Sequence, residues 1–482
     1  MNSTRHSYRP LINLIAGPVG GFILYQIVLY FSADEMMART IGLATWMVTW
    51  WILESVPLPV TALLPLIILP LANISSIGEA ASSYANPVIF LFMGGFMLAL
   101  ALQKHRLHER IALNILRYTG TSGNGIILGF TIATAVLSMW VSNTATAVMM
   151  LPIAISVTDL LLADARLDSD ERKFALGLML SIAYAANIGG FMTIIGTPPN
   201  VVMAGYLSKL ANYEMSFSRW LLVGIPCGIM MLTVVYLLTT RILFRNNLKA
   251  VSGSRQLVNN KLAELGALKQ EEKVVIAIFG MTIFAWMFKA QINSLLGANL
   301  LTDHVTAMAG GSAMFIIPSG IKPVRTLLTW DDTRDLPWGI LLLFGGGISL
   351  AAAMEKVGII EHIGAYVASY DSINKLLLIL LVTAIVLFMT ELMSNVALVT
   401  IMLPVLIAVA AGMGEDPLRL VIPATMASSC AFMMPISTPP NAIVYSSGYI
   451  RINDMMRAGF LLNLIAVIIL SVFTYYLVPF LS

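Results

Sequence analysis

The sequence predicts an all-α protein that crosses a lipid bilayer many times, and composition, segment length and an internal repeat support this prediction. Of 482 residues, 58% are hydrophobic and 11% are charged, whereas soluble proteins keep about a quarter of their residues charged. Lipid must therefore cover most of the surface. Apolar segments recur along the chain, and many approach the roughly 20 residues that a helix needs to cross a hydrocarbon core. They lie at about 10–32, 39–53, 57–73, 85–103, 123–161, 174–208, 217–242, 273–291, 302–317, 337–354, 373–411, 417–447 and 456–480.

Basic residues in the short loops predict the orientation of the chain, because cytoplasmic loops carry an excess of Lys and Arg. Basic loops alternate with loops that are acidic or neutral, such as Asp34-Glu35, 292–303 and Glu415-Asp416. We therefore expect a multi-pass protein of the cell (inner) membrane, with its N-terminus in the cytoplasm and its C-terminus outside. Loop charge does not separate re-entrant hairpins from pairs of full spans. The basic sites lie at Arg5 and Arg9, at 104–110, in the loop 243–271, at Lys322 and Arg325, and at Arg451 and Arg457.

Three motifs occur twice in the same order, about 240–252 residues apart. Ordered recurrence of three motifs indicates two related halves. The loop count places the long hairpin-like segments of the two halves on opposite faces, which predicts an inverted-topology repeat, a common plan among secondary transporters. The pairs are Gly94-Gly95 with Gly345-Gly346, Ser142-Asn143-Thr144 with Ser394-Asn395-Val396, and Gly196-Thr197-Pro198-Pro199-Asn200 with Ser437-Thr438-Pro439-Pro440-Asn441.

The Ser-Asn motifs interrupt the long apolar segments 123–161 and 373–411. Non-helical backbone at membrane depth survives only inside protein or beside water, and Ser, Asn and Thr are preferred helix N-caps. The first motif predicts one helix that ends near Ser138 to Val141 and a second that starts near Ala145. The new helix offers its positive end to an anion, and the ending helix offers free carbonyls to a hard cation.

The Thr-Pro-Pro-Asn motifs predict two broken helices, because proline removes an amide and disfavours helix at the residue before it. Proline is well tolerated at the first position of a new helix. We expect gaps at Gly196-Thr197-Pro198 and at Ser437-Thr438-Pro439. Two re-entrant tips and two broken helices then supply four half-helix ends to one midplane site. Glu391 and Glu54 are further candidates, since carboxylates within or near the membrane are costly.

An anion at this site would meet hydroxyls, amides and helix dipoles. Segments 123–161 and 174–208 contain no Lys or Arg, and 373–411 contains only Lys375 near its start. Because a divalent anion in a low-dielectric pocket is strongly disfavoured unless its charge is offset, co-bound sodium ions are a physical means of offsetting it.

The doubled motifs resemble those of the divalent anion/sodium symporter family, over essentially the whole chain. The resemblance implies a homodimer with about 11 transmembrane helices and two re-entrant hairpins per subunit, working as an inverted-repeat elevator transporter. It also implies a scaffold of residues 10–118 and 272–369 and a transport domain of residues 119–242 and 373–480, with 243–271 as a cytoplasmic loop.

The family resemblance further implies two sodium sites and one substrate site. One sodium ion would bind Ser138, Ser142, Asn143 and Gly196, and the other Thr390, Met393 through its carbonyl, Asn395 and Ser437. The substrate would contact Ser142, Asn143, Thr144 and Thr197 from the first half and Ser394, Asn395, Thr438 and Pro439 from the second. Val396 stands where Thr is common, so this sequence lacks one hydroxyl of the doubled motif, which leaves the identity of the anion open.

We expect a secondary active transporter that couples sodium influx to uptake of a small divalent anion, most simply a C4 dicarboxylate such as succinate. A dicarboxylate exchanger and a sodium-coupled sulfate or citrate transporter are the alternatives. An enzyme is disfavoured, because the chain has no His-Glu-x-x-His, Gly-x-Ser-x-Gly or phosphate-binding Gly-Lys-Ser/Thr motif. Sodium ions are the expected bound cations, with no organic cofactor and no nucleic acid.

Overall fold

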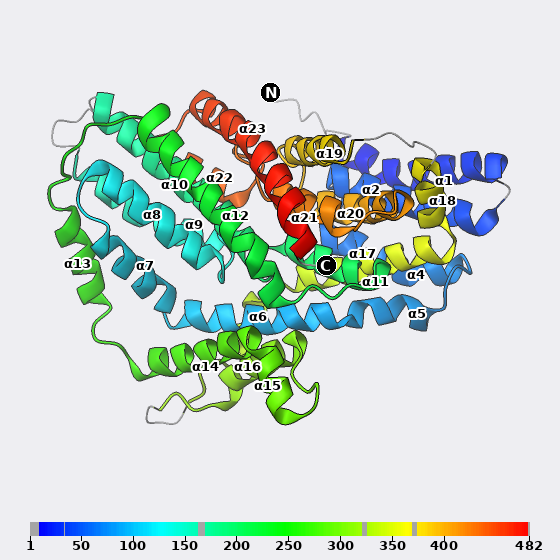
Figure 1. Cartoon of the computed structure of the whole chain (residues 1–482), viewed down its shortest axis with the longest axis horizontal. Coiled ribbons are helices and arrows are strands. Elements are labelled where there is room, and N and C mark those ends of the chain that lie inside the picture. Colours follow the sequence, from blue (N-terminus) through cyan, green and yellow to red (C-terminus); the bar gives the residue numbers. More distant parts are fainter. Residues whose placement is uncertain (1–8, 33, 162–168, 321–324, 369–373, 481–482) are drawn as a thin grey trace, which may run out of the picture.

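The computed structural model describes residues 9–32, 34–161, 169–320, 325–368 and 374–480, and these are helical almost throughout (Figure 1). The β-structure among the described residues is one isolated bridge between Pro318 and Thr326. Of the basic sites predicted to be cytoplasmic, Arg5 and Lys322 lie outside the described residues. The chain is all-α, as the sequence predicts.

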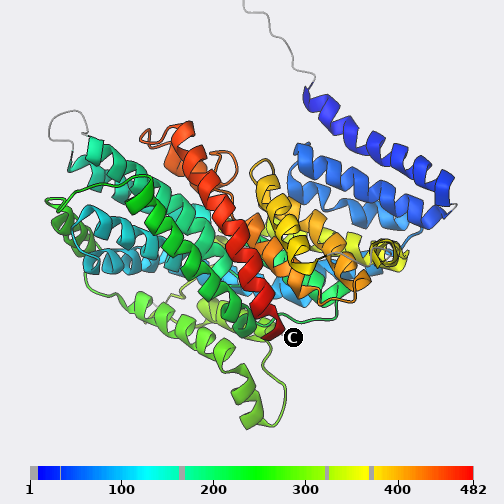
Figure 2. The ribbon, with the colours of Figure 1, turned by 45° about the horizontal axis from the view of Figure 1, so that its top comes forward.

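The first predicted scaffold segment begins with α1, which packs along α2 at the edge of the molecule (Figure 2). Gly21 and Gly42 allow the close approach of these two helices, since a Cβ atom at Gly21 would lie 2.6 Å from the Gly42 carbonyl oxygen. The apolar segment 57–73 is divided into short helices among its prolines. The helices are α1 (Arg9–Ser32), α2 (Glu35–Leu53), α3 (Leu58–Thr61), α4 (Leu64–Leu71), α5 (Ile77–Ser82), η1 (Ser83–Ala85), α6 (Pro87–Lys104) and α7 (Leu107–Tyr118).

The first predicted transport segment follows, and its interruptions fall where the motifs place them. α8 ends at Ser138 and α9 begins at Asn143, so the two form a hairpin. The 16 residues of α8 span about 24 Å at 1.5 Å per residue, which is short for a full crossing and favours a re-entrant hairpin. The helices are α8 (Gly123–Ser138), α9 (Asn143–Asp159), α10 (Ser169–Met192), α11 (Pro198–Leu210), α12 (Phe217–Leu237), the π-helical turn η2 (Leu238–Ile242) and, in the loop 243–271, α13 (Ser254–Glu264).

The second half repeats this arrangement with a longer interruption in its broken helix. The segment between α21 and α22, residues 429–438, has no helix, whereas its counterpart between α10 and α11 covers only residues 193–197. The helices are α14 (Gln270–Met287), α15 (Lys289–Leu296), α16 (Asp303–Ile316), η3 (Trp330–Asp335), α17 (Trp338–Lys356), α18 (Ile359–Ala368), α19 (Lys375–Met389), α20 (Asn395–Gly412), α21 (Leu418–Ser428), α22 (Pro439–Tyr445), α23 (Ile452–Leu477) and η4 (Val478–Phe480).

Seven helical stretches of the described residues are long and apolar enough to cross a membrane, and an eighth is added if α14 and α15, bent by 78°, count as one span. Several shorter apolar helices, among them α8, α19 and α21, are arms of the interrupted segments. The chain is therefore a multi-pass membrane protein.

The two halves interlock near the middle of the molecule. α10 packs against α22, α9 packs against α22, and α11 packs against α20 (Figure 1). Each of these pairs joins one interrupted segment of the first half to one of the second. The four interruptions are thereby brought together.

α6 and α16 pack closely side by side and run in the same direction, so their ends distinguish the two faces of the molecule. A Cβ atom at Gly94 would meet the Ala307 backbone, and one at Gly311 would lie 3.1 Å from the Gly94 Cα atom. Ala307 thus faces Gly94, and a Cβ atom at Gly311 would also lie 3.1 Å from the Met97 sulfur. The residue numbers therefore rise in the same direction along both helices, and the beginning of α16 lies near the beginning of α6. The end of α6 lies on the opposite face, where His105 contacts the Leu327 carbonyl.

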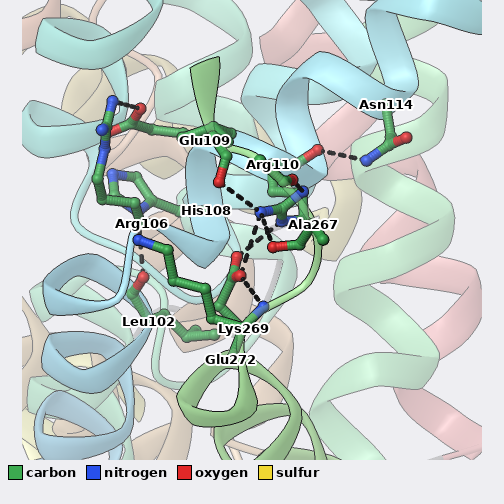
Figure 3. Close-up of polar contacts among 11 residues, drawn as sticks. Leu102, Arg106, His108, Glu109, Arg110, Asn114, Ala267, Lys269 and Glu272 are labelled. Atoms are coloured by element: carbon green, nitrogen blue, oxygen red, sulfur yellow. Dashed lines mark hydrogen bonds and ion pairs between the residues drawn. The ribbon is translucent and has the colours of Figure 1, made fainter. Parts of the chain in front are cut away.

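The amphipathic helix α7 is held by Arg110 against the loop that leads into α14 (Figure 3). Arg110 forms two contacts with the Glu272 carboxylate, at 2.7 and 3.1 Å, and donates to the backbone carbonyls of Leu265, Gly266 and Ala267. Glu272 also accepts from the Lys269 amide at 2.7 Å. This cluster connects the end of the loop 243–271 to α7.

Candidate functional site

The interruptions of all four segments line one cavity of about 780 Å³. The candidate substrate residues all lie in its lining, namely Ser142, Asn143, Thr144, Thr197, Ser394, Asn395, Val396, Thr438 and Pro439. The candidate cation ligands Gly196, Met393 and Ser437 line it as well. The remaining candidates, Ser138 and Thr390, are fully buried and contact the two asparagines of the Ser-Asn motifs.

The first hairpin tip brings three oxygen atoms together. Ser138 Oγ lies 2.6 Å from Asn143 Oδ1 and 2.7 Å from the Ala186 carbonyl oxygen. A hydroxyl has a single hydrogen, so Ser138 donates to one of these two acceptors at a time. The other acceptor then faces the Ser138 oxygen without a hydrogen between them. A convergence of hydroxyl, amide and carbonyl oxygens is the ligand chemistry that hard cations prefer.

The second hairpin tip repeats the same arrangement. Thr390 Oγ1 lies 2.6 Å from Asn395 Oδ1 and 2.6 Å from the Ser428 carbonyl oxygen. Two clusters of matched composition, one in each half, therefore adjoin the cavity. The sequence did not identify the carbonyls of Ala186 and Ser428, since a backbone oxygen has no residue-type signature.

Four helices begin at the cavity. Ser142 caps α9 by accepting from the Ala145 amide at 3.3 Å, whereas the Ser394 side chain forms no capping bond at the start of α20. Thr197 and Thr438 precede α11 and α22 in extended conformation, each followed by two prolines. The positive ends of these helices favour negative charge in the cavity.

The asparagines that close the Thr-Pro-Pro-Asn motifs hold the broken helices together. Asn200 Nδ2 donates to the Thr193 carbonyl at 2.7 Å, and Asn441 Nδ2 donates to the carbonyls of Ala431 and Met434 at 3.0 Å each. Each asparagine thus binds carbonyls that the interrupted helix leaves free. The sequence analysis gave them no role, although their recurrence in both halves was a usable signal.

Asn187 connects the two halves at the cavity. This buried residue of α10 donates to Thr438 Oγ1 and to the Ala431 carbonyl, at 3.2 Å each. It orients the Thr438 hydroxyl, and it lines the cavity itself. The sequence analysis did not select Asn187, yet a lone asparagine in an otherwise apolar helix is a functional signal in a membrane.

The cavity is lined on its other side by the predicted scaffold. The residues concerned come from the end of α2, from α6 and from the start of α17, and they include Glu54, Gln103 and Asp335. No Lys, Arg or His is among the described residues of the lining. Gln103 and Asp335 lie at the face where α6 ends, so the mouth of the cavity is on that face.

The opposite face is closed by aromatic side chains and one carboxylate. Phe217, the first residue of α12, stacks on Trp286 with ring centroids 4.5 Å apart, and Trp140 of the hairpin tip packs on Phe279 at 5.0 Å. The Phe217 amide donates to Asp303 Oδ2 at 2.8 Å, and Lys289 pairs with the other Asp303 oxygen at 2.7 Å. Since Asp303 begins α16, this contact lies far from the mouth.

Glu391 is buried beside the second hairpin tip. Its two carboxylate oxygens accept from the amides of Phe432, Met433 and Met434, from the Ser437 hydroxyl and from the Asn463 side chain. Glu54, the other carboxylate selected from the sequence, is exposed at the cavity rim. The two candidates therefore have different surroundings.

A family model described as the sodium:sulfate symporter transmembrane region matches residues 27–481. The chain belongs to this family. The match covers nearly the entire sequence, including both copies of the paired motifs. Because this is a family of transporters, the chain is not an enzyme.

Two curated relatives extend the match. The chain is 37% identical to the sodium-dependent dicarboxylate transporter SdcS of Staphylococcus saprophyticus and 38% identical to SdcS of Staphylococcus aureus, each over 97% of this chain and 91% of the relative. Both alignments span nearly the whole chain, including the region in which its paired motifs lie.

Two solved structures share the fold of this chain. The YdaH transporter of Alcanivorax borkumensis aligns with a TM-score of 0.58 at 14% identity, over 84% of this chain and 87% of that one. MtrF of Neisseria gonorrhoeae aligns with a TM-score of 0.56 at 11% identity, over 86% and 83%. At these identities the likeness concerns the fold alone, and it agrees with the predicted class of polytopic helical transporter.

Proposed function

We propose that this protein is a secondary active transporter that couples sodium influx to the uptake of a C4 dicarboxylate such as succinate. The observation that carries the proposal is the pair of matched oxygen clusters beside a cavity that has helix N-termini and no basic side chain in its described lining. Membership of the family and the sodium-dependent dicarboxylate relatives support the same function.

The two sodium ions are assigned to the hairpin tips. The first ion binds Ser138, Ser142, Asn143 and Gly196, and the second binds Thr390, the Met393 carbonyl, Asn395 and Ser437. The Ala186 and Ser428 carbonyls, which contact Ser138 and Thr390, complete the two sets. Hydroxyl, amide and carbonyl oxygens are suited to a hard cation.

The dicarboxylate is assigned to the space between the two tips. Its carboxylates accept from the motif hydroxyls and amides and from the uncapped start of α20, where the Ser394 side chain leaves backbone donors free. Helix N-termini and two nearby sodium ions offset the double negative charge. Val396 presents two methyl groups where the first half presents the Thr144 hydroxyl, so one carboxylate has one donor fewer.

We assign the mouth of the cavity to the cytoplasm. The mouth lies where α6 ends at Lys104, next to the basic stretch 104–110, and basic loops favour the cytoplasmic side. The N-terminus is then cytoplasmic, and the described conformation is open inward. Transport proceeds by movement of residues 119–242 and 373–480 against a scaffold of residues 10–118 and 272–369, in a homodimer.

Uptake of radiolabelled succinate, citrate and sulfate into proteoliposomes tests this function. We expect succinate to accumulate under an inward sodium gradient and to remain at background when choline replaces sodium. Sodium-independent uptake that accelerates in succinate-loaded vesicles would identify an exchanger instead. Sodium-driven uptake of sulfate or citrate without succinate would overturn the assigned substrate.

A further inference from the structure

Glu391 is the most heavily hydrogen-bonded carboxylate near the cavity. It lies beside the second proposed sodium site and has no counterpart beside the first. Its side chain is 3% exposed. Oε1 accepts from the Phe432 amide at 2.7 Å, from the Met433 amide at 2.9 Å and from Asn463 Nδ2 at 2.8 Å. Because every one of these partners is a donor, the group is satisfied as a carboxylate.

The backbone that Glu391 binds is the non-helical segment 429–438. Oε2 accepts from the Met434 amide at 3.2 Å, so three successive amides of this segment donate to one side chain. Without Glu391, these three amides would need helix carbonyls or water as acceptors, and neither is free at membrane depth. The carboxylate therefore determines the path of the chain that leads to Ser437 and Thr438.

Glu391 also fixes how Ser437 presents its oxygen. Ser437 Oγ lies 2.7 Å from Glu391 Oε2 and 2.9 Å from the Glu391 carbonyl oxygen, both acceptors. The single hydrogen of the hydroxyl is used in these contacts, so its remaining lone pairs are available to a cation. Partners of this kind orient metal ligands and set their basicity. Ser437 lines the cavity.

The first half has no equivalent charge. Three residues before Ser142 stands Met139, as Glu391 stands three residues before Ser394. The Met139 carbonyl accepts from the Thr193 hydroxyl, which repeats the Ser437 contact with the Glu391 carbonyl, but the methionine side chain is neutral. The first cluster therefore has only neutral oxygens, whereas the second adjoins a fixed negative charge.

We propose that Glu391 is a positioning residue that makes the second sodium site, at Thr390, Asn395 and Ser437, the one that fills without substrate. A cation at this site is attracted by the neighbouring carboxylate. The first site, at Ser138 and Asn143, offers no formal charge, so its sodium ion binds together with the dicarboxylate, which supplies that charge. This inference rests on the proposed function and adds an order of binding to it.

Sodium titrations of the purified full-length protein test this order, with the midpoint of thermal unfolding as the readout and choline chloride holding the ionic strength constant. Without dicarboxylate, we expect sodium to raise the midpoint in the wild type and in Asn143→Ala but not in Asn395→Ala. Loss of the response in Asn143→Ala with retention in Asn395→Ala would overturn the proposal, and this comparison does not depend on any Glu391 variant.

Glu391→Gln tests the residue itself. Glutamine keeps the shape of the side chain. When its NH2 group stands in place of Oε2, it faces the Met434 N–H and donates to Ser437 Oγ. This hydrogen bond occupies a lone pair that Ser437 would otherwise offer to the cation. We expect the half-saturating sodium concentration without substrate to rise roughly 10- to 100-fold, as for other partners of metal ligands. Glu415→Gln is the matched control, because this carboxylate pairs with Lys375 and Arg419 in the loop between α20 and α21.

The outcomes separate the two proposals. An unchanged sodium response in folded Glu391→Gln would remove the role of this residue. If Glu391→Gln does not fold, Ser437→Ala replaces it, and an unchanged response there would overturn the proposal equally. A wild type that shows no sodium response with or without succinate would instead refute sodium coupling, and with it the proposed function.

Discussion

Gly190→Ala separates stability from sodium binding. Gly190 lies in the buried helix α10, where a Cβ atom would stand 2.5 Å from Asn143 Oδ1 and 2.8 Å from Asn143 Nδ2. Ordinary contacts begin at 3.4 Å, so the amide oxygen must retreat by 3.4 − 2.5, or about 0.9 Å. If the oxygen moves directly away from Ser138, the 2.6 Å between Ser138 and Asn143 lengthens to as much as about 3.5 Å, beyond a good hydrogen bond.

The expected result is a protein whose stability stays close to that of the wild type, because the helix gain offsets the lost hydrogen bond, but which binds sodium poorly. Alanine in a helix is favoured over glycine by about 1 kcal/mol, and the obstructing atoms belong to the end of one side chain. Binding constellations tolerate displacements of only about 0.5 Å. We therefore expect the half-saturating sodium concentration for succinate uptake to rise by roughly 10- to 100-fold.

Succinate uptake at graded sodium concentrations and the thermal unfolding midpoint measure the two effects. Gly280→Ala in α14 is the matched control, because a Cβ atom there meets nothing within 4 Å, and we expect it to leave the sodium dependence unchanged. Uptake by folded Gly190→Ala with wild-type sodium dependence would refute the first cation site.

Three further predictions follow from the site. Asn143→Ala and Asn395→Ala should each abolish uptake while gel filtration shows folded protein, and sodium-dependent transport retained in both would remove the site assignment. Val396→Thr should lower the half-saturating succinate concentration roughly tenfold, because a hydrogen bond to a charged group contributes about 1.5 kcal/mol; an unchanged or higher value in uptake assays counts against that contact. Asp303→Asn weakens the acceptor of the Phe217 amide at the start of α12, on the closed face. An impermeant maleimide added outside should therefore label a Thr144→Cys reporter faster than it labels the same reporter in the protein with Asp303. Equal labelling rates in the two proteins would contradict the closure.

The positions of the interruptions were predictable because they depend on local chemistry. Ser142 at the start of α9 and the double prolines after Thr197 and Thr438 specify helix starts through capping and missing amides. The structure places these starts within a few residues of the expected positions, and the residues chosen from the motifs line one cavity.

The features that sequence analysis missed depend on backbone atoms and on tertiary contacts. Nothing in the apolar run Cys430-Ala431-Phe432-Met433-Met434 signals an unwound segment, because its amides are bound by Glu391, which precedes them by about 40 residues. The carbonyls of Ala186 and Ser428 likewise have no side-chain signature. Glu391 itself was a candidate as a carboxylate within or near the membrane, but its burial and its five donors depend on the tertiary structure.

The hydrogen bond from Asn187 to Thr438 joins residues 251 positions apart, and this separation has a consequence for biosynthesis. While the ribosome is still translating the second half, α10 has inserted but lacks the partner for its buried amide. The cavity is then incomplete, and a polar group faces lipid or other helices. A nascent chain truncated before α22 should therefore remain open to proteolysis and chaperone binding, and ion binding should arise only near the end of synthesis.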